Sequence, residues 1–327
     1  MTLAQQRPGP IIVGIGEALF DRIAGKGDHL GGAPLNFAVH AKQMLAGESL
    51  AGGRSVLVSR VGRDALGDRL LAALRAFGVE TDAIQTDLDR ATGIVDVSIG
   101  ESGPSYLFRE DPAWDNVVFT DRLEELSYAF DAVCFGTLAR RRPATASAIE
   151  RFVRNGTDRD TVRLYDVNLR PGATEYEVVR RGLELASIAK MNDEELPVIA
   201  EMFGASAKDE IGQAATIIRA FGLQQLMLTR GARGVIVYTP DSVYEGEASK
   251  ATISASSDAV GAGDSCGAAY AVRLLSGDSP FTAATVANKV GAYVASHSGA
   301  TPSLPAHLTR ERPSVDLVTA RRRVVDI

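Results

Sequence analysis

The sequence predicts an α/β fold, with a mostly parallel central sheet flanked by helices on both faces and a small antiparallel β lid. Short apolar runs recur along the chain, amphipathic segments lie between many of them, and two further segments alternate apolar with polar residues. The chain has 327 residues, of which 45% are hydrophobic and 23% are charged. These values are typical of a globular protein and exclude a disordered or collagen-like chain.

The buried strands are predicted by apolar runs that are rich in Val and Ile and bounded by glycine or polar residues. They are residues 11–15, 55–61, 131–135, 162–165, 187–190 and 226–229. Helical periodicity follows many of them, at residues 64–77, 144–153, 176–186 and 209–221. Alternating strands and helices imply a parallel sheet, and in such sheets ligands bind beyond the carboxyl ends of the strands.

The lid is predicted by two segments at about residues 17–32 and 92–119. Both alternate apolar and polar residues, as a half-exposed antiparallel sheet does. A small sheet at the edge of the larger one could cover the strand ends. A solvated hairpin insert explains the same periodicity equally well.

Charge and cysteine usage narrow the class of protein. The chain has 35 Lys and Arg against 41 Asp and Glu, a formal net charge of −6, so neither nucleic acid nor an anionic membrane is an expected partner. Only two cysteines, Cys134 and Cys266, are present, which favours a cytoplasmic protein. We expect a polar N-terminal tail at 1–10, one α/β unit at 11–308 and a C-terminal tail at 309–327.

The stretch from Asp258 to Tyr270 is the most informative part of the sequence. Its Gly261-Ala262-Gly263 bend lets backbone N–H groups approach an anion, and a predicted helical run at 268–275 follows. Asp264 at this bend has two interpretations. It is either the cap of the helix or a base beside a phosphate-binding bend.

Other polar groups follow predicted strands or precede helices. Asn192 and Glu195 could hold a hydrated Mg²⁺ through water, or cap a helix and occupy its first turn. Asn36, after a double glycine, could bind a hydroxylated ligand or act as a cap. Thr229-Arg230-Gly231-Ala232-Arg233-Gly234 is a glycine-containing loop after a strand. A P-loop motif is absent from the sequence.

The motifs taken together resemble those of the ribokinase-like, or PfkB, carbohydrate kinases. The resemblance runs from about residue 11 to residue 305, with the motifs in the expected order: Gly-Gly at 31–36, V-G-x-D-x-x-G at 61–67, D-x-N-x-R at 166–170, N-x-x-E at 192–195 and G-A-G-D at 261–264. The opening at 16–21, the Gly-Ala-Pro at 32–34 and the arginine-bearing segment at 108–115 are most similar to the fructokinase group. Related 2-keto-3-deoxygluconate kinases share several of these features.

The resemblance implies a role for each matching position. Asp264 would be the base that deprotonates the sugar hydroxyl, beside an anion hole formed by Gly261, Ala262 and Gly263. The remaining positions are Asp21, Gly32, Asn36 and Arg109 for the sugar; Asn168, Arg170, Asn192 and Glu195 for the phosphate and Mg²⁺ region; Thr229, Gly231, Gly234 and Asn288 for the nucleotide; and Asp258, Val260, Val294, His297, Gly299 and Ser303 for K⁺.

The resemblance therefore implies an ATP- and Mg²⁺-dependent kinase, with fructose converted to fructose 6-phosphate as the expected reaction. A 2-keto-3-deoxygluconate kinase or another sugar kinase is the alternative within the enzymes. A sugar- or nucleotide-binding protein that has lost catalysis is the alternative of a different class. An exposed lid edge favours pairing with a second copy, so a homodimer through the lid is a further expectation.

Overall fold

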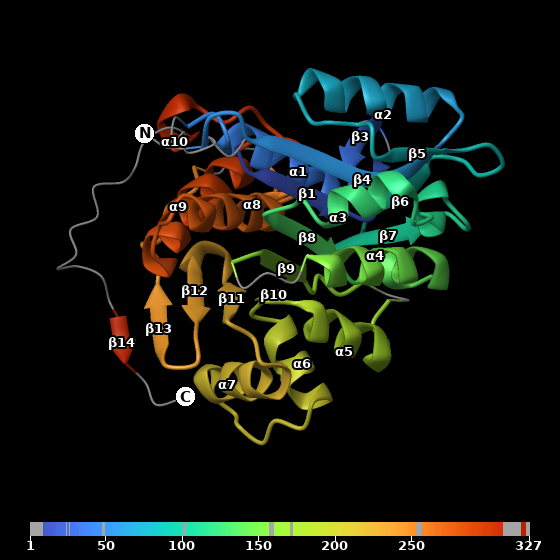
Figure 1. The fold of residues 1–327 in the computed structure, drawn as a ribbon. Helices are drawn as coiled ribbons and strands as arrows, with labels where there is room; N and C mark the ends of the chain where they lie inside the picture. Colours follow the sequence, from blue (N-terminus) through green and yellow to red (C-terminus); the bar gives the residue numbers. More distant parts are fainter. Residues whose placement is uncertain are drawn as a thin grey trace, which may run out of the picture.

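The computed structural model describes residues 9–23, 25, 27–47, 50–100, 103–156, 160–170, 173–252, 257–309 and 322–324. A sheet of ten strands runs through the molecule in the order β14-β13-β12-β11-β10-β9-β8-β1-β4-β5 (Figure 1). Its parallel strands are β1 (Ile11–Ile15), β4 (Arg54–Gly62), β5 (Ile84–Asp87), β8 (Ala132–Gly136), β9 (Val162–Asp166), β10 (Ile188–Asn192) and β11 (Gln225–Thr229). The antiparallel strands β12 (Val235–Tyr238), β13 (Ser242–Glu245) and β14 (Arg322–Val324) complete one side.

The predicted fold class is confirmed, and each predicted strand appears within a residue or two of its expected bounds. The expected tails need one correction. Residues 322–324 form β14, which pairs with β13, so part of the expected C-terminal tail belongs to the sheet. Residues 1–8 and the rest of that tail beyond Thr309 lie outside the described residues.

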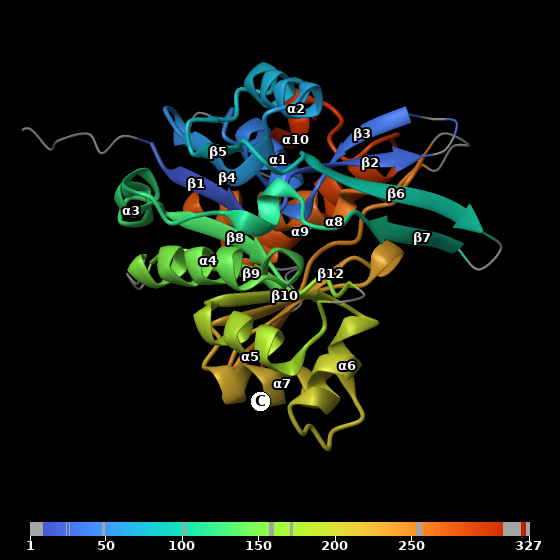
Figure 2. The same ribbon diagram turned by 90° about the vertical axis from the view of Figure 1, so that its right-hand side faces the viewer.

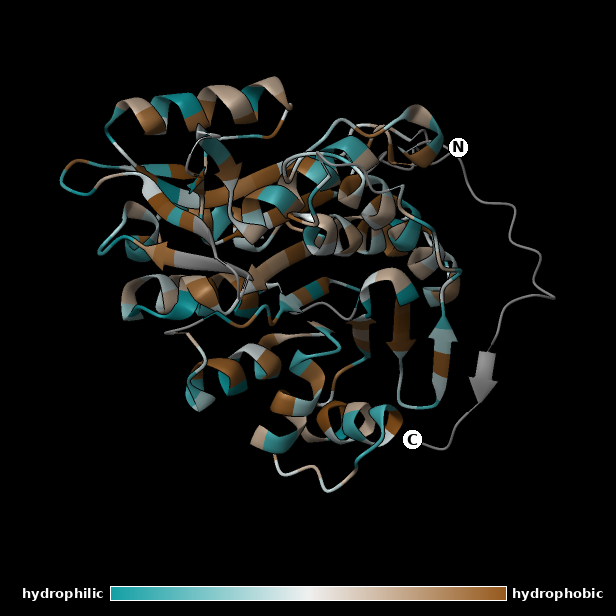
Figure 3. Ribbon diagram, turned by 180° about the vertical axis from the view of Figure 1, so that it is seen from behind, coloured by the Kyte–Doolittle hydropathy of each residue, from teal (hydrophilic) through white to brown (hydrophobic). Residues whose placement is uncertain are grey.

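Helices cover both faces of the sheet because successive strand residues point to opposite sides. Ile12, for example, belongs to one apolar cluster, whereas Val13 belongs to another. On the first face lie α1 (Ala33–Met44), α8 (Ala262–Leu275) and α9 (Pro280–Ala295), and on the second α3 (Asp121–Ser127), α4 (Pro143–Asn155), α5 (Tyr176–Leu185), α6 (Glu195–Met202) and α7 (Glu210–Phe221). Figure 3 shows the hydrophobic colour concentrated in the inner strands, with alternating bands along the outer helices.

Two further helices complete the fold. Helix α2 (Ala65–Ala76) packs with α1 over β4 in a third apolar cluster. The last described helix is α10 (Ala306–Thr309). None of the helices in the described part of the chain combines the length and the apolar run that a membrane span needs.

The lid is a separate sheet of four strands that projects from one side of the body (Figure 2). The hairpins β2 (Leu19–Ile23) with β3 (Gly27–Gly31) and β6 (Gly93–Gly100) with β7 (Gly103–Phe108) are antiparallel, and β2 and β6 join them in parallel. The second segment predicted for the lid, at about residues 92–119, extends beyond the lid strands of the structure. Residues 113–116 form a short 3-10 helix, and Trp114, only 1% exposed, packs in the core of the body.

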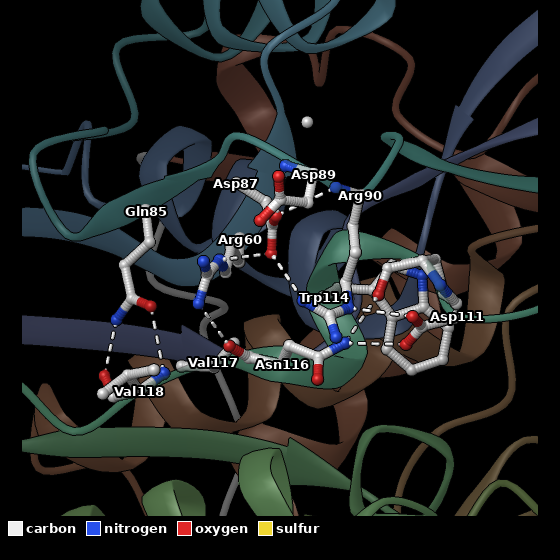
Figure 4. A network of polar contacts seen from close by, with 12 residues as sticks. Arg60, Gln85, Asp87, Asp89, Arg90, Asp111, Trp114, Asn116, Val117 and Val118 are labelled. Atoms are coloured by element: carbon white, nitrogen blue, oxygen red, sulfur yellow. Dashed lines mark hydrogen bonds and ion pairs between the residues drawn. The ribbon is translucent and has the colours of Figure 1, made fainter.

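Polar contacts fasten the base of the lid to the main sheet (Figure 4). Arg60 on β4 pairs with Asp87 on β5 at 2.9 Å, and its guanidinium also donates to the Asn116 carbonyl at 2.7 Å. Arg90 pairs in turn with Asp111 at 2.9 Å. The chain that leaves the lid is thus held at a fixed place on the edge of the sheet.

The V-G-x-D-x-x-G segment ties the lid to a helix. Asp64 caps α2 by accepting the Gly67 amide at 2.8 Å. The same carboxylate accepts the amide and the hydroxyl of Thr92, the residue before β6, each at 2.8 Å. One side chain therefore sets both the start of a helix and the start of a lid strand.

Candidate active site

A cavity of about 580 Å³ lies between the lid and the ends of the central strands. One face of the lid lines it, because alternate residues of β2 (Leu19, Asp21 and Ile23) point the same way. Val95 and Val97 of β6 lie on the same face. Of the two interpretations of the alternating segments, the structure shows the lid, with an apolar side turned toward a polar floor.

The floor of the cavity is the start of α8. This helix begins at Ala262, so the expectation that it starts near residue 268 was wrong. Gly261 is the N-cap, with φ of +77°, and a Cβ there would lie 2.3 Å from the Ala300 carbonyl oxygen. Packing against Ala300 therefore requires glycine at this position, and it overrides the low helix propensity of a Gly-Ala-Gly stretch.

Asp264 lies in the first turn of α8 and lines the cavity. It does not hold the N-cap position, which belongs to Gly261. Its Oδ2 atom accepts a hydrogen bond from the Asn36 side-chain amide at 2.8 Å. Asn36 is likewise inside its helix, where Gly32 is the N-cap. Both side chains are thus directed at the cavity, and the capping interpretations of both are wrong.

Acidic groups gather around this cavity. Burial and the nearby Asp166 carboxylate raise the pKa of Asp264 to about 6, against the lowering effect of Lys190. Burial also raises the pKa of Glu17 to about 7 and that of Asp21 to about 6. Because low-polarity surroundings disfavour a charged carboxylate, these groups titrate near neutral pH.

Two buried polar atoms at the cavity have no hydrogen-bond partner among the described residues. They are Oε2 of Glu17 and Oδ1 of Asn36. Both residues line the cavity. A buried polar atom without a partner is costly unless a ligand supplies one, so these atoms are suited to a hydroxylated molecule.

The glycine bend differs from the predicted anion hole in one respect. Gly261 and Gly263 line the cavity, but the Ala262 amide donates to the Ala259 carbonyl at 3.2 Å. That bond closes the turn which introduces the helix. The bend therefore offers the amides of its two glycines, together with the positive end of the helix dipole.

Most of the predicted sugar and phosphate residues meet at this cavity, but Arg109 does not. Those that line it are Asp21, Gly32, Asn36, Asn168 and Arg170. Arg109 is about half exposed and pairs with Asp96 at 3.1 Å on the lid surface. Because Phe108 beside it points into the cavity, Arg109 points to the opposite face of the lid.

The predicted nucleotide residues form a second group at the ends of β10 to β12. Asn192 and Thr229 are register partners in neighbouring strands. Gly231 and Gly234 bound the turn that follows β11. The Asn288 side chain on α9 reaches this loop, since a Cβ on Gly234 would lie 2.9 Å from its Nδ2 atom. These residues lie together, outside the cavity lining.

Glu195 occupies the first turn of α6, as one of the two interpretations predicts, but the N-cap is Glu194 and Asn192 lies before it, at the end of β10. The Asn192 side chain accepts the amides of Glu194 and Glu195, and Glu195 accepts the amides of Asn192 and Leu169. The two side chains thus bond each other's backbone amides, as in a capping box, in the turn that leads into α6. Each carboxylate oxygen retains a lone pair, so Glu195 fits a Mg²⁺ ion that is held mainly by water and substrate phosphates. The described residues contain no cluster of acidic, His or Cys side chains able to hold a metal by themselves.

The positions matched to a K⁺ site also gather. Asp258 accepts the amides of Val260 and Gly299 through its carboxylate, and its own amide donates to the His297 carbonyl at 3.1 Å. The His297 amide donates to Val294. Ser303 joins them only through the Tyr293 hydroxyl, which donates to the Ser303 carbonyl. Several of the positions matched to K⁺ are therefore joined in one backbone-rich cluster around Asp258.

Three residues at the site were not predicted as functional: Glu17, Asp166 and Lys190. Glu17 and Asp166 lie within recognised motifs, which was the available signal for them. Lys190 carried a different signal. It is a charged residue at the end of an otherwise apolar strand, and the structure buries it to 5% exposure.

The fold and this site together define a phosphotransferase that acts on a small hydroxylated molecule. The sequence model of one family, described as "pfkB family carbohydrate kinase", matches residues 25–307. The chain belongs to this family. It is an ATP-dependent carbohydrate kinase.

Individual relatives agree with this assignment. An uncharacterized sugar kinase of Pyrococcus horikoshii, PH1459, is 30% identical to this chain over 63% of this chain and 69% of its own length. Its crystal structure superposes with a TM-score of 0.75 and covers 90% of this chain and 94% of its own. "Probable fructokinase-5" of Arabidopsis thaliana is 25% identical over 90% of this chain and 94% of its own. A 2-dehydro-3-deoxygluconokinase of Thermoproteus tenax is 26% identical over 85% and 83% of the two chains.

Proposed function

We propose that the protein transfers the γ-phosphate of ATP to a hydroxyl group of a ketose, with fructose converted to fructose 6-phosphate. The observation that carries this proposal is the placement of Asp264. Its carboxylate lies in a sugar-sized cavity at the start of α8, beside the amides of Gly261 and Gly263 and bonded to Asn36. A base and an anion site at one point are what hydroxyl phosphorylation needs.

In this mechanism Asp264 accepts the proton of the sugar hydroxyl as the hydroxyl oxygen attacks the γ-phosphorus. Asn36 fixes the orientation of the carboxylate through its 2.8 Å hydrogen bond. The glycine amides and the helix dipole stabilise the charge on the transferring phosphoryl group. Asn192 and Glu195 would hold Mg²⁺ through water, and the ion would neutralise phosphate charge. The lid excludes water, which limits wasteful hydrolysis of ATP.

The charge of the cavity favours a neutral sugar. Glu17, Asp21 and Asp264 all line it, against the cationic Arg170. Carboxylates bind hydroxyl groups as acceptors and repel anionic substrates. This balance supports fructose over a sugar acid or a phosphosugar.

A second candidate is 2-keto-3-deoxygluconate. Arg170 lies in the cavity and could pair with the carboxylate of this sugar acid. The similarity to the Thermoproteus tenax 2-dehydro-3-deoxygluconokinase supports the same candidate.

The experiment is an assay of ADP release over fructose, ribose, 2-keto-3-deoxygluconate, fructose 1-phosphate and adenosine, with wild type and Asp264→Asn. We expect fructose to give the highest kcat/KM, and the variant to lose about 10² to 10⁴ in turnover while binding ATP and sugar within a few-fold. Near wild-type turnover in the variant would show that Asp264 is not the base. Binding of sugar and ATP without any turnover would instead indicate a non-catalytic binding protein.

We also propose accessory features for this function. The kinase unit spans about residues 11–308. K⁺ binds the backbone-rich cluster around Asp258. Replacing K⁺ in the assay by a bulky organic cation should therefore lower kcat.

Two copies of the chain pair through the lid, where Leu107 on the edge strand β7 is 69% exposed. Light scattering would test this pairing. A cytoplasmic location, where ATP is supplied, agrees with two buried free cysteines.

A further inference from the structure

A buried ion pair lies directly beneath the start of α8. Lys190 and Asp166 are register partners on the neighbouring strands β10 and β9, and Nζ of Lys190 lies 2.8 Å from Oδ2 of Asp166. The two residues are 5% and 3% exposed, and neither lines the cavity. Their charge is therefore held inside the protein, behind the lining of the cavity.

Lys190 runs along the first turns of α8, on the side where the helix has only glycines. A Cβ on Gly263 would lie 3.4 Å from Nζ of Lys190, and a Cβ on Gly267 would lie 3.4 Å from its Cδ atom. Asp264 is the residue next to Gly263. The ammonium group is thus placed under the turn that carries the proposed base.

Stability alone does not account for this pair. Leu164 and Ile188 occupy the preceding positions on the same face of the same strands, and both are buried and apolar. A buried ion pair contributes little to stability compared with well-packed apolar residues, because both charges must be stripped of water. On this face of the two strands the only charged residues are Asp166 and Lys190, next to Asp264.

We propose that Lys190 is a positioning residue for the reaction: its fixed charge beneath the first turn of α8 favours the ionised, proton-accepting form of Asp264, and Asp166 anchors the ammonium while opposing this effect. The inference rests on the proposed function, because it requires Asp264 to act as the base.

Other charged and titratable groups around Asp264 also affect its ionisation. The charged groups that face it are Asp166, Lys190, Arg170 and Glu17. Burial raises the pKa of the neighbouring thiols Cys134 and Cys266, so these stay neutral. Burial and Asp166 raise the pKa of Asp264, whereas Lys190, the Asn36 hydrogen bond and Arg170 lower it, to give about 6.

The test is the pH dependence of kcat/KM for the sugar in Lys190→Met, Asp166→Asn and the double variant, at saturating MgATP. Without Lys190 the acidic limb of the pH profile, where kcat/KM falls as Asp264 is protonated, should move to higher pH by about one unit. Without the Asp166 charge the same limb should move to lower pH by a similar amount. The double variant should return close to the wild-type limb. Opposite shifts of this kind are not produced by a residue that is only structural.

The matched control is Asp278→Asn. It breaks the buried Arg273–Asp278 pair near the far end of the same helix, with side chains 6% and 12% exposed. This variant should lose stability but keep the wild-type pH limb. If Lys190→Met does not fold, Asp166→Asn still tests the inference, since it leaves the lysine with a hydrogen-bond acceptor.

Each outcome separates the two claims. An inactive Asp264→Asn with opposite limb shifts in the single variants supports both. An inactive Asp264→Asn with unmoved limbs, or limbs that move in the same direction, overturns the role of Lys190 and leaves the proposed function standing. An active Asp264→Asn overturns the assignment of Asp264 as the base in the proposed function, and the role of Lys190 with it.

Discussion

The side chains of the cavity under the lid and the polar residues at the ends of β10 to β12 differ in how their hydrogen bonds are completed. In the cavity, Glu17 and Asn36 each keep a buried oxygen with no partner among the described residues. At the strand ends, Asn192 and Glu195 bond to backbone amides, and the Asn288 amide donates to the Glu247 carbonyl at 2.9 Å. Without a ligand the cavity oxygens lack a partner in the described part of the chain, whereas Asn192, Glu195 and Asn288 are bonded within the protein.

This difference separates residues that bind the sugar from residues that stabilise the loops of the protein. Side chains in the cavity should control sugar affinity, and some of them should lower the stability of the free protein. Side chains at the strand ends should stabilise the loops, whose backbone and shape then receive the nucleotide. Variants in the two regions should therefore separate the two KM values and change stability in opposite directions.

The largest expected effect comes from Gly261→Ala, on the floor of the cavity. The added Cβ would lie 2.3 Å from the Ala300 carbonyl, and φ is +77°, so the bend must move. Displaced amides should lower kcat by about 10² to 10³, as for a lost anion-hole donor. Steady-state kinetics measures this.

Gly277→Ala is the matched control for that variant. Gly277 has φ of +82° just after the other end of α8, but no atom lies within 4 Å of the position that an added Cβ would take. It should cost only the local strain of about 1 kcal/mol and leave kcat unchanged. Equal losses of kcat in the two variants would contradict the role of the bend.

Asp21→Asn should raise the KM for the sugar about 10- to 100-fold, since a hydrogen bond to a charged group contributes roughly 1.5–3 kcal/mol. The KM for ATP should stay nearly unchanged, because Asp21 lies on the lid face of the cavity, away from the strand ends. Initial-rate kinetics with each substrate varied in turn provides the measurement. A matched rise in both KM values would remove the separation of the two regions.

Glu17→Gln should stabilise the free protein at pH 8. The pKa of Glu17 is raised from 4.5 to about 7, so its contribution to stability is full below pH 4.5 and is lost as the pH rises through 7. At pH 8 the ionised group costs ~3 kcal/mol, which the neutral amide avoids. Thermal melts should show the gain at pH 8 and little gain at pH 5. Glu201→Gln, on the exposed side of α6, is the control, and an equal gain in it would refute the explanation.

Asn288→Ala should give the smallest change in function and a loss of stability. It leaves the Glu247 carbonyl without its amide donor, at a cost of about 1–3 kcal/mol in the free energy of unfolding. The KM for ATP should rise only a few-fold and the KM for sugar should not change. Urea unfolding and the same kinetic assay test both parts. A changed sugar KM would show that the two regions are coupled.

The sequence predicted what depends on local pattern. Apolar runs such as residues 11–15 have few alternatives to a buried strand, and the bend at Gly261 to Asp264 carried its signal in its own residues. The start of α8 was missed because its packing against Ala300, which is distant in the chain, decides it. The Lys190–Asp166 pair was missed because the register of two parallel strands creates it. Arg109 was placed in the cavity although its neighbour Phe108 takes the inward position.

The most direct measurement of the central claim is a crystal structure with a non-hydrolysable ATP analogue and fructose. We predict the terminal phosphorus at the amides of Gly261 and Gly263, with one sugar hydroxyl between it and the Asp264 carboxylate. A terminal phosphate bound away from this bend, or a sugar with no hydroxyl near Asp264, would contradict the account.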